Sequence, residues 1–496
     1  MTFDFQNPFA NYGSIVCRER FIGRKDALRD IENRVIRPLE SGNLAIIGLP
    51  RIGKSSLAYK ALVERKKELN AKKLLPIWIN ISTYDQAFVL LHSLVTYCVE
   101  ELKELNLLSK PIREASQHVL DSKSSLSNNY GHIQRFFQKV RQFGYRIVFI
   151  LDEFDYARYL FKGDIVYFQR LRDLSDNPEW RVNFVTTSRR SIRDIEIQTG
   201  GISTFDGIFH KCYLAMFDDD DLQEYFGRFE SISASIPPGS EDRISFYCGG
   251  YPYLLEMLGY EIIELFRVKK NVNMDELVNR IEQSFLDHYD RIVNLLKEDG
   301  SLYKLLQILF GPVIDAKRAD IDELVRYGLI KPTERQEKYI AFSGHFQTFL
   351  NIIEREIDLW PLWRETEKAL RVLITNKMSE KYGECWIEEI EKRRPNLKAM
   401  FDACRGAQIK EERLFGSRAS QNLIDFTYPQ DLFDIIFAEW ETFKSVFSKD
   451  RTYWSQRAQL LGKIRNPLAH NRDESLYDDM RKTAEGYCKE ILRIMK

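Results

Sequence analysis

The chain has 496 residues, of which 44% are hydrophobic and 29% are charged, a globular balance that excludes a wholly disordered or collagen-like protein. This length exceeds one ordinary hydrophobic core and predicts roughly two to four domains. With 73 basic and 73 acidic residues the formal net charge is zero, which argues against a protein that coats nucleic acid non-specifically.

The sequence shows no signal for membrane insertion, secretion or zinc binding. No uncharged apolar run approaches the ~20 residues of a membrane span, and the first residues lack the basic and apolar regions of a signal peptide. The seven cysteines are widely spaced, without a C-x-x-C pair or a Cys/His cluster. We therefore expect reduced thiols, no zinc site and a cytoplasmic protein without a membrane partner.

Residues 1–217 alternate short apolar runs with helical patterns. The runs are rich in β-forming residues and lie at Leu44–Leu49, Leu74–Ile81, Arg146–Asp152, Asn183–Ser188 and Lys211–Met216. Strands that are apolar on both faces are typical of a parallel sheet covered by helices on both sides. We therefore predict an α/β core over residues 1–217, with a polar surface loop at residues 121–129.

Three further regions follow this core. Residues 218–274 have a helical pattern that breaks at residues 236–239 and 249–252. Residues 275–352 carry two helical patterns and a short hairpin, the order of a winged-helix domain. In residues 353–496, apolar residues recur at helical spacing, as in the stripe Phe433, Ile436, Phe437, Trp440 and Phe443, which predicts an all-α bundle.

The strongest motif is GLPRIGKS at residues 48–55, which fits G-x-x-x-x-G-K-[ST] between an apolar strand and a helical pattern. Backbone N–H groups of such a loop, together with the start of its helix, bind phosphates. We expect Gly48, Gly53 and Ser56 to shape the loop around ATP. Lys54 would bridge the β- and γ-phosphates, and the Ser55 hydroxyl would bind Mg²⁺.

A second nucleotide motif ends the apolar run at residues 147–151, where Asp152 and Glu153 follow. The carboxyl end of a buried parallel strand lies at the same sheet edge as the phosphate loop. Asp152 is therefore expected to bind the Mg²⁺ held by Ser55. Glu153 would lie near the γ-phosphate as the general base that polarises the attacking water.

Together with three weaker features, these motifs resemble the STAND class of signalling ATPases, part of the wider AAA-like group. The weaker features are Phe21–Asp26, Thr186–Arg189 and Gly250–Pro252, with the winged helix after them. The resemblance covers residues 15–350, and it implies a P-loop ATPase core with a helical lid at residues 218–274.

The same resemblance implies roles for three further residues. Arg24 would contact the surroundings of adenine or ribose, Arg189 would read the γ-phosphate, and Pro252 would pack on the base. The alternatives are an arginine at a helix start, an arginine that faces solvent and a proline in a turn.

Near the end of the chain, Arg465, Asn466 and His470 form an Arg-Asn-x3-His motif. The stretch before it carries basic residues and no acid, a pattern that suits a phosphate backbone; these residues are Arg451, Arg457, Lys463 and Arg465. With aromatic runs at residues 359–363 and 437–440, this tail resembles the HEPN domains, many of which are metal-independent ribonucleases built from two paired units.

The HEPN resemblance implies a chemistry for the motif. His470 would take the proton from a ribose 2′-OH, Arg465 would stabilise the charge that develops at phosphorus, and Asn466 would orient the pair. Some HEPN domains only pair chains, so a ribonuclease and a non-catalytic pairing module are both possible interpretations.

The motifs together predict an ATP-dependent signalling switch, with ATP and Mg²⁺ as cofactors, that forms a homo-oligomer and pairs its HEPN tails to cleave RNA. Analogy with the family suggests prokaryotic antiphage or toxin-type defence, with a separate sensor protein because the chain has no repeat array. One alternative is an ATP-dependent DNA-binding initiator or loader that uses the winged helix, although acidic residues in the candidate recognition helix weaken it. Another is an ATP-gated scaffold with a non-catalytic HEPN domain.

Overall fold

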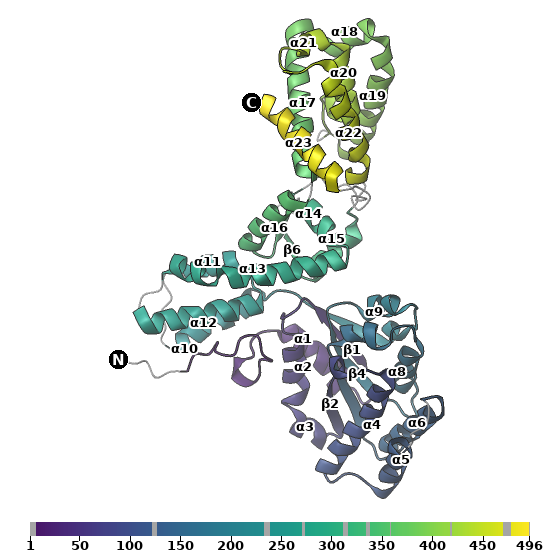
Figure 1. The fold of residues 1–496 in the computed structure, drawn as a ribbon. Helices are drawn as coiled ribbons and strands as arrows, with labels where there is room; N and C mark the ends of the chain where they lie inside the picture. Colours follow the sequence, from purple (N-terminus) through teal and green to yellow (C-terminus); the bar gives the residue numbers. More distant parts are fainter. Residues whose placement is uncertain are drawn as a thin grey trace. The chain divides into compact units, whose positions relative to one another are not determined.

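The computed structural model describes residues 6–121, 126–232, 239–269, 273–310, 316–333, 338–357, 359–416, 419–469 and 478–495. The chain forms two compact units (Figure 1). The first comprises Met1–Leu309 and Ala316–Phe349, and the second comprises Phe310–Asp315 and Leu350–Lys496. Within the described residues, no helix is both long and apolar enough to cross a membrane. All seven cysteines are described, and none is in a disulfide.

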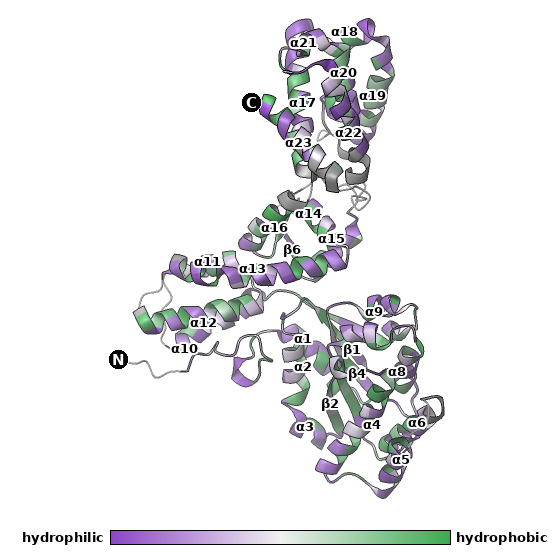
Figure 2. Cartoon of the chain, in the orientation of Figure 1, coloured by the Kyte–Doolittle hydropathy of each residue, from purple (hydrophilic) through white to green (hydrophobic). Residues whose placement is uncertain are grey.

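A five-stranded sheet with the order β2-β3-β4-β1-β5 lies at the centre of the first unit, and every neighbouring pair is parallel. The strands are β1 (Asn43–Gly48), β2 (Leu74–Asn80), β3 (Arg146–Asp152), β4 (Asn183–Ser188) and β5 (Phe209–Leu214). Figure 2 colours the central strands as hydrophobic, and β1 and β4 are buried at every position. The predicted α/β core with a parallel sheet is therefore confirmed.

Helices cover this sheet, and their bounds depart from the prediction at one place. They are α1 (Lys25–Ile31), α2 (Lys54–Ala58), α3 (Lys66–Ala71), α4 (Ala87–Glu104), α5 (Lys110–Leu120), α6 (Leu126–Gln142), α7 (Ala157–Leu160), α8 (Val166–Asp176) and α9 (Ile192–Thr199). The loop predicted at residues 121–129 is wrong from Leu126 onward, where α6 begins; residues 122–125 lie outside the described part. The reason is that Ile133, Phe136 and Val140 bury one face of α6 in the core.

Short turns of 3-10 or π helix connect several of these elements. They lie at Arg18–Arg20, Glu32–Ile36, Tyr59–Val63, Ile81–Thr83, Phe154–Tyr156 and Phe205–Ile208. The turns at Glu32–Ile36 and Tyr59–Val63 are π-helical and continue α1 and α2 directly.

The rest of the first unit has the predicted order. A helical region comes first, and two helices with a hairpin come after it. The elements that begin in this part of the unit are α10 (Asp219–Ser231), α11 (Ser240–Cys248), α12 (Pro252–Lys269), α13 (Met274–Glu298), α14 (Leu302–Phe310), α15 (Arg318–Arg326), β6 (Ile330–Pro332), β7 (Tyr339–Ala341) and α16 (Gly344–Ile357). Strands β6 and β7 pair antiparallel, so helices α14 and α15 with this small wing have the arrangement expected of a winged helix.

The second unit is a helical bundle with its own core. Its helices are α17 (Leu359–Tyr382), α18 (Trp386–Arg393), α19 (Pro395–Phe415), α20 (Pro429–Ala438), α21 (Trp440–Phe443), α22 (Arg451–Ala469) and α23 (Asp478–Ile494), with a 3-10 turn at Leu423–Phe426. Trp363, Phe433 and Trp454 are among its most buried residues. The predicted all-α bundle is confirmed.

One helix predicted in this bundle is in fact two, because the stripe from Phe433 to Phe443 breaks at Glu439. The Glu439 carboxylate is buried, and Lys381 and the Tyr382 hydroxyl each donate a hydrogen bond to it over 2.9 Å. Arg394 donates a third over 3.2 Å. A buried carboxylate needs such partners, and the break after Ala438 lets Glu439 meet side chains from α17 and from the start of α19.

Gly249 lies directly against the backbone that follows β7. It directly follows α11 with φ at +54°, and a Cβ there would clash with the Phe342 carbonyl oxygen. We predict that Gly249→Ala lowers the free energy of unfolding by about 2–4 kcal/mol, because it adds both strain and a clash with the backbone. Chemical denaturation monitored by circular dichroism would measure the loss.

Gly131→Ala is the matched control for this change. Gly131 lies within α6, and a Cβ there would meet nothing within 4 Å, so we expect this variant to be neutral or more stable by up to about 1 kcal/mol. Equal stability of both variants and the native chain would show that Gly249 is not constrained.

Candidate functional site

The phosphate loop joins the end of β1 to the start of α2. Gly53 has φ at +101° and directly precedes the helix, a conformation that glycine adopts without strain. Lys54 is the first residue of α2, and its ammonium donates hydrogen bonds to the carbonyl oxygens of Gly48 over 3.0 Å and Leu49 over 2.8 Å. The backbone therefore has the shape that the motif predicts, with Lys54 curled back over the loop.

The Asp152 carboxylate lies at the centre of the sheet edge. The Ser55 hydroxyl donates a hydrogen bond to it over 2.8 Å, and the Thr187 hydroxyl, from β4, donates to the same oxygen. The Glu153 backbone N–H donates to Thr187 Oγ1 over 3.2 Å. The start of α2 and the ends of β3 and β4 are thus brought together, with Ser55 beside Asp152 as the two nucleotide motifs predicted and Thr187 as an added partner.

Ser55 and Asp152 suit a magnesium ion by their chemistry. Mg²⁺ prefers oxygen ligands and binds through one or two protein oxygens together with substrate phosphates. A hydroxyl and a carboxylate 2.8 Å apart, at the mouth of a phosphate loop, are such a pair. These two residues would hold the ion.

A cavity of about 610 Å³ opens above the loop. Its lining includes Gly53, Lys54, Ser55 and Ser56 of the loop and helix start, and Asp152, Glu153 and Arg189 at the ends of β3 and β4. Pro252, the first residue of α12, also lines it. Most of the residues that the sequence singled out for nucleotide binding therefore surround one cavity.

Arg24 lies beside this cavity and contacts the phosphate loop. Its guanidinium donates to the Ile52 carbonyl over 3.0 Å and lies 4.7 Å from the centroid of the Phe217 ring. Burial lowers the pKa of Arg24 to about 10. It also lines a small hollow together with Ser56 and Pro252, so contact with the surroundings of a nucleotide stays a prediction.

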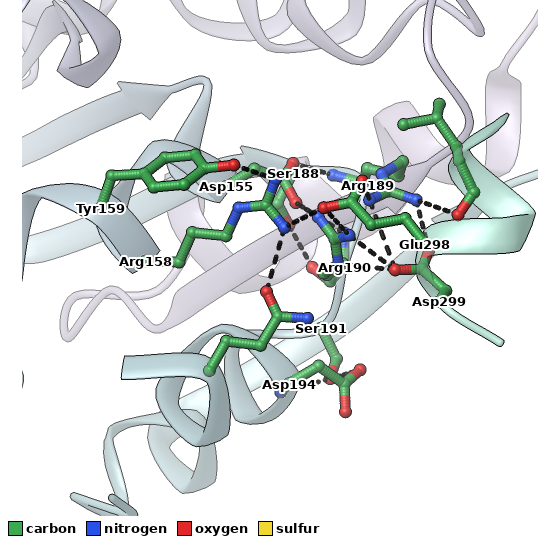
Figure 3. Close-up of polar contacts among 12 residues, drawn as sticks. Asp155, Arg158, Tyr159, Ser188, Arg189, Arg190, Ser191, Asp194, Glu298 and Asp299 are labelled. Atoms are coloured by element: carbon green, nitrogen blue, oxygen red, sulfur yellow. Dashed lines mark hydrogen bonds and ion pairs between the residues drawn. The ribbon is translucent and has the colours of Figure 1, made fainter. Parts of the chain in front are cut away.

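Arg189 lines the cavity but is held by acidic residues at the end of α13 (Figure 3). Its guanidinium forms an ion pair with Asp299 and lies 3.5 Å from Glu298. The side chain is 11% exposed, so the alternative of an arginine that faces solvent does not hold. The neighbouring Arg190 pairs with the same two acids.

The charges in the cavity shift the titration of two side chains. Burial lowers the pKa of Lys54, and the charge of Arg189 lowers it further, against the opposing effect of nearby acids. Burial and the neighbouring Asp152 charge raise the pKa of Glu153. A carboxylate with a raised pKa is a stronger proton acceptor, which suits the role predicted for Glu153.

Sequence reasoning missed several other parts of the cavity, among them Asp155, Arg158 and Arg190. The segment Gly13–Val16 forms one wall, where the Val16 N–H donates to Ser56 Oγ over 2.9 Å. The Arg51 guanidinium lies 4.3 Å from the centroid of the Tyr253 ring, and both residues line the cavity. The position of Tyr253 directly after Pro252 was a signal for this contact, whereas residues 13–16 carry no motif.

In the second unit, the predicted catalytic motif is only partly described. Arg465 and Asn466 lie on α22, where the backbone alone is described, and His470 lies outside the described residues. The basic stripe predicted before them is interrupted, because Arg457 donates to Glu490 of α23 over 2.9 Å. The Arg457 guanidinium also lies 3.3 Å from the centroid of the Tyr453 ring. Arg457 therefore stabilises the bundle.

Comparison with known proteins identifies the C-terminal domain. Residues 365–495 match the Swt1-like HEPN family, so the second unit contains a HEPN domain. No curated protein matches the chain.

Several solved structures are similar to the first unit. The Walker-type ATPase PABY2304 of Pyrococcus abyssi has 15% identity and a TM-score of 0.42, over 71% of this chain and 100% of that one. The ORC1 protein of Aeropyrum pernix, solved in complex with DNA, has 13% identity and a TM-score of 0.38, over 69% and 94%. The RuvB Holliday junction branch migration motor of Thermotoga maritima has 13% identity and a TM-score of 0.34, over 65% and 93%. By its own phosphate loop on a parallel sheet and by the family match of its tail, the chain combines a P-loop ATPase-like region with a HEPN domain, as the sequence predicted.

The geometry predicts the effect of removing the loop lysine. Lys54→Ala should weaken ATP binding several-fold to several-hundred-fold, about 1–4 kcal/mol, because the phosphates lose their nearest ammonium. Titration calorimetry with ATP and Mg²⁺ would measure this loss. Lys67→Ala, at an exposed position on α3, is the control and should bind as the native chain does; unchanged affinity in Lys54→Ala would refute the site.

Proposed function

We propose that this protein is an ATP-dependent signalling switch that activates a metal-independent HEPN ribonuclease. One observation carries the proposal: Lys54, Ser55, Asp152 and Glu153 converge on one cavity in a chain that also contains a HEPN domain. ATP and Mg²⁺ bind in the cavity, and the bound nucleotide sets the oligomeric state. Pairing of chains then brings two HEPN domains together.

The residues of the cavity have separate roles in ATP hydrolysis. Lys54 binds the β- and γ-phosphates, while Gly48, Gly53 and Ser56 shape the loop around them. Ser55 and Asp152 hold Mg²⁺, which offsets the phosphate charge. Glu153 accepts the proton of the attacking water.

Three more residues complete the nucleotide site in this proposal. Arg189 reads the γ-phosphate, Arg24 supports the surroundings of the base and ribose, and Pro252 packs against the base. Support comes from the position of Arg189 and Pro252 on the cavity wall and of Arg24 beside it.

The HEPN site would cleave RNA by transfer within the ribose. His470 removes the 2′-OH proton, and the resulting oxygen attacks the adjacent phosphorus. The bond from phosphorus to the 5′ oxygen breaks, and that oxygen takes up a proton and leaves as a hydroxyl. Arg465 stabilises the charge on the phosphate oxygens, and Asn466 orients the pair. This chemistry uses an imidazole and a guanidinium, and it predicts products that end in a 2′,3′-cyclic phosphate.

The biological setting is proposed by analogy with signalling ATPases. The protein acts in the cytoplasm as a homo-oligomer in prokaryotic antiphage or toxin-type defence, and a separate sensor protein supplies its signal. The domains would be a P-loop core at residues 1–217, a helical lid at 218–274, a winged helix at 275–352 and a HEPN domain at 353–496.

Contacts of α15 disfavour the alternative of a DNA-binding initiator or loader. The Arg326 guanidinium lies 5.2 Å from the centroid of the Tyr213 ring in β5, and the Tyr327 hydroxyl, one residue after α15, donates to the Arg189 carbonyl over 2.9 Å. The helix also carries Asp320, Asp322 and Glu323, which a phosphate backbone repels. The other alternative, an ATP-gated scaffold with a non-catalytic HEPN domain, is left to experiment.

The role of Glu153 can be separated from binding. Glu153→Gln should keep ATP affinity but slow hydrolysis by about 10²–10⁴-fold, the usual contribution of a general base. Steady-state phosphate release would measure the rate, with the exposed Glu104→Gln of α4 as the control. Hydrolysis at the native rate in Glu153→Gln would assign the base to another residue.

The ribonuclease is tested by incubating the chain with tRNA and ATP. We expect cleavage that His470→Ala or Arg465→Ala abolishes, while ATP hydrolysis continues, since the two sites lie in separate units. Once ATP-dependent assembly is complete, cleavage should persist in a metal chelator. DNA should stay intact, because it has no 2′-OH.

His118→Ala, at an exposed position on α5, is the control for these variants and should cleave like the native chain. Cleavage of DNA, or RNA cleavage that survives His470→Ala, would exclude the mechanism. An absence of cleavage under every nucleotide condition would favour the scaffold with a non-catalytic HEPN domain.

A further inference from the structure

Three arginines form one wall of the nucleotide cavity, and two neighbouring acids hold all three (Figure 3). Arg158 donates to Glu298 over 2.8 Å, and Arg190 donates to Asp299 over 2.6 and 2.9 Å. Arg189 pairs with Asp299 as well. The two acids lie at the end of α13, more than 100 residues along the chain from the arginines, so the contact ties the ATPase core to the helix that leads into the winged helix.

The arginines separate two cavities. Arg189 and Arg190 line both the nucleotide cavity and a second one of about 480 Å³, whose lining includes Glu298 and Asp299. Neither acid lines the nucleotide cavity. Arg189 and Arg190 thus contact the acids and also line the cavity that contains the phosphate loop.

Hydrogen bonds hold the backbone of Arg189 and Arg190 in place, whereas their guanidinium groups could pair with either the acids or a phosphate. Asp155 accepts the N–H of Arg189 and, over 3.1 Å, the N–H of Arg190. Both residues therefore keep their place at the end of β4 whichever partner the guanidinium groups take. Arg189 is also close enough to Lys54 to lower the pKa of its ammonium, after the larger effect of burial, so it lies within electrostatic range of the phosphate loop.

A phosphate is a chemically equivalent partner for these arginines. The planar guanidinium binds the oxygens of a carboxylate or of a phosphate in the same forked geometry. The side chains of Glu298 and Asp299 are 43% and 26% exposed, whereas those of Arg158, Arg189 and Arg190 are 16% exposed or less. On separation the acids can therefore move into water, while the arginines stay on the cavity wall. Arg190 keeps Asp155, 3.7 Å away, whereas Arg158 and Arg189 lose the acids with which they pair.

We propose that the γ-phosphate of ATP and the α13 acids, Glu298 and Asp299, are alternative partners of Arg158, Arg189 and Arg190. The acids act as an internal mimic of the γ-phosphate and hold α13 against the core. ATP displaces them and releases α13, whereas ADP lacks the group that competes. This inference rests on the proposed function, since it assigns to the nucleotide site the means by which it distinguishes ATP from ADP.

Release of α13 would reach the winged helix directly. Only residues 299–301 separate α13 from α14, the first helix of the winged helix. The Tyr327 hydroxyl, next to α15, donates to the Arg189 carbonyl. Movement at the arginine wall would thus act on α14 through residues 299–301 and on the end of α15 through Tyr327.

The test compares nucleotide affinities of the full chain and of Glu298→Gln/Asp299→Asn. Affinities for ADP and for the β,γ-imido analogue of ATP, each with Mg²⁺, are measured by competition with a fluorescent nucleotide. We expect the double variant to bind the ATP analogue roughly 5- to 100-fold more tightly than the native chain, a coupling of ordinary size. Its ADP affinity should be unchanged, because ADP does not compete for the arginines.

A charge-matched variant controls for the loss of two acids. Asp287→Asn/Asp290→Asn removes two exposed carboxylates from the same helix, away from the arginines, and should bind both nucleotides as the native chain does. Hydrogen exchange of residues 290–300 gives a second measurement. In the native chain it should rise with the ATP analogue but not with ADP, and in the Glu298/Asp299 variant it should be high throughout.

The outcomes separate this inference from the function on which it rests. An unchanged ratio of ATP-analogue to ADP affinity in the folded double variant would overturn the competition but leave the nucleotide site intact. Failure of the native chain to bind either nucleotide would overturn both. If the double variant does not fold, Glu298→Gln alone carries the same test, because its side chain is the more exposed of the two.

Discussion

The Asp152 carboxylate receives hydrogen bonds from the hydroxyl groups of Ser55 and Thr187, and the cavity depends on this junction. These hydroxyls come from the start of α2 and from β4, and Asp152 itself ends β3. The parallel register makes the junction possible, since it pairs Leu151 with Thr186 and Ile47 with Ser188. A shift of one residue in any of these strands would turn the side chains to the opposite face and separate the groups.

The strands were predictable because burial on both faces leaves an unmistakable apolar run. The runs Arg146–Asp152 and Asn183–Ser188 coincide with β3 and β4 residue for residue. At the edge of the sheet the signal is weaker: β5 begins two residues before the predicted run, since Phe209 pairs with Asn43. The start of α6 and the break at Glu439 were missed because tertiary contacts, and not local composition, decide them.

In the candidate site, too, some residues could be predicted from local sequence and others depend on long-range contacts. The phosphate loop and the Asp152–Glu153 pair are contiguous in sequence, so their chemistry can be read locally. The partners of Arg189 cannot, because Asp299 lies 110 residues further along the chain and no spacing rule connects them. Arg457 looked like part of a basic surface, but its partner Glu490 is on another helix. Long-range ion pairs of this kind depend on the fold, and a single sequence does not encode them in any recognisable pattern.

Residues 7–16, which we call the strap, contact several parts of the first unit. The hydrogen bond from the Val16 N–H to Ser56 Oγ is one of these contacts. Asn7 donates to Glu264 of α12 over 2.8 Å, and the buried ring of Phe9 lies 5.1 Å from that of Phe229 in α10. The strap thus passes from the helices after the core to the phosphate loop. A fragment that begins at Phe21 would lose the ring of Phe9 from the helices and the Val16 contact from the phosphate loop, so a fragment meant to isolate the ATPase needs residues 7–16 as much as its glycine loop.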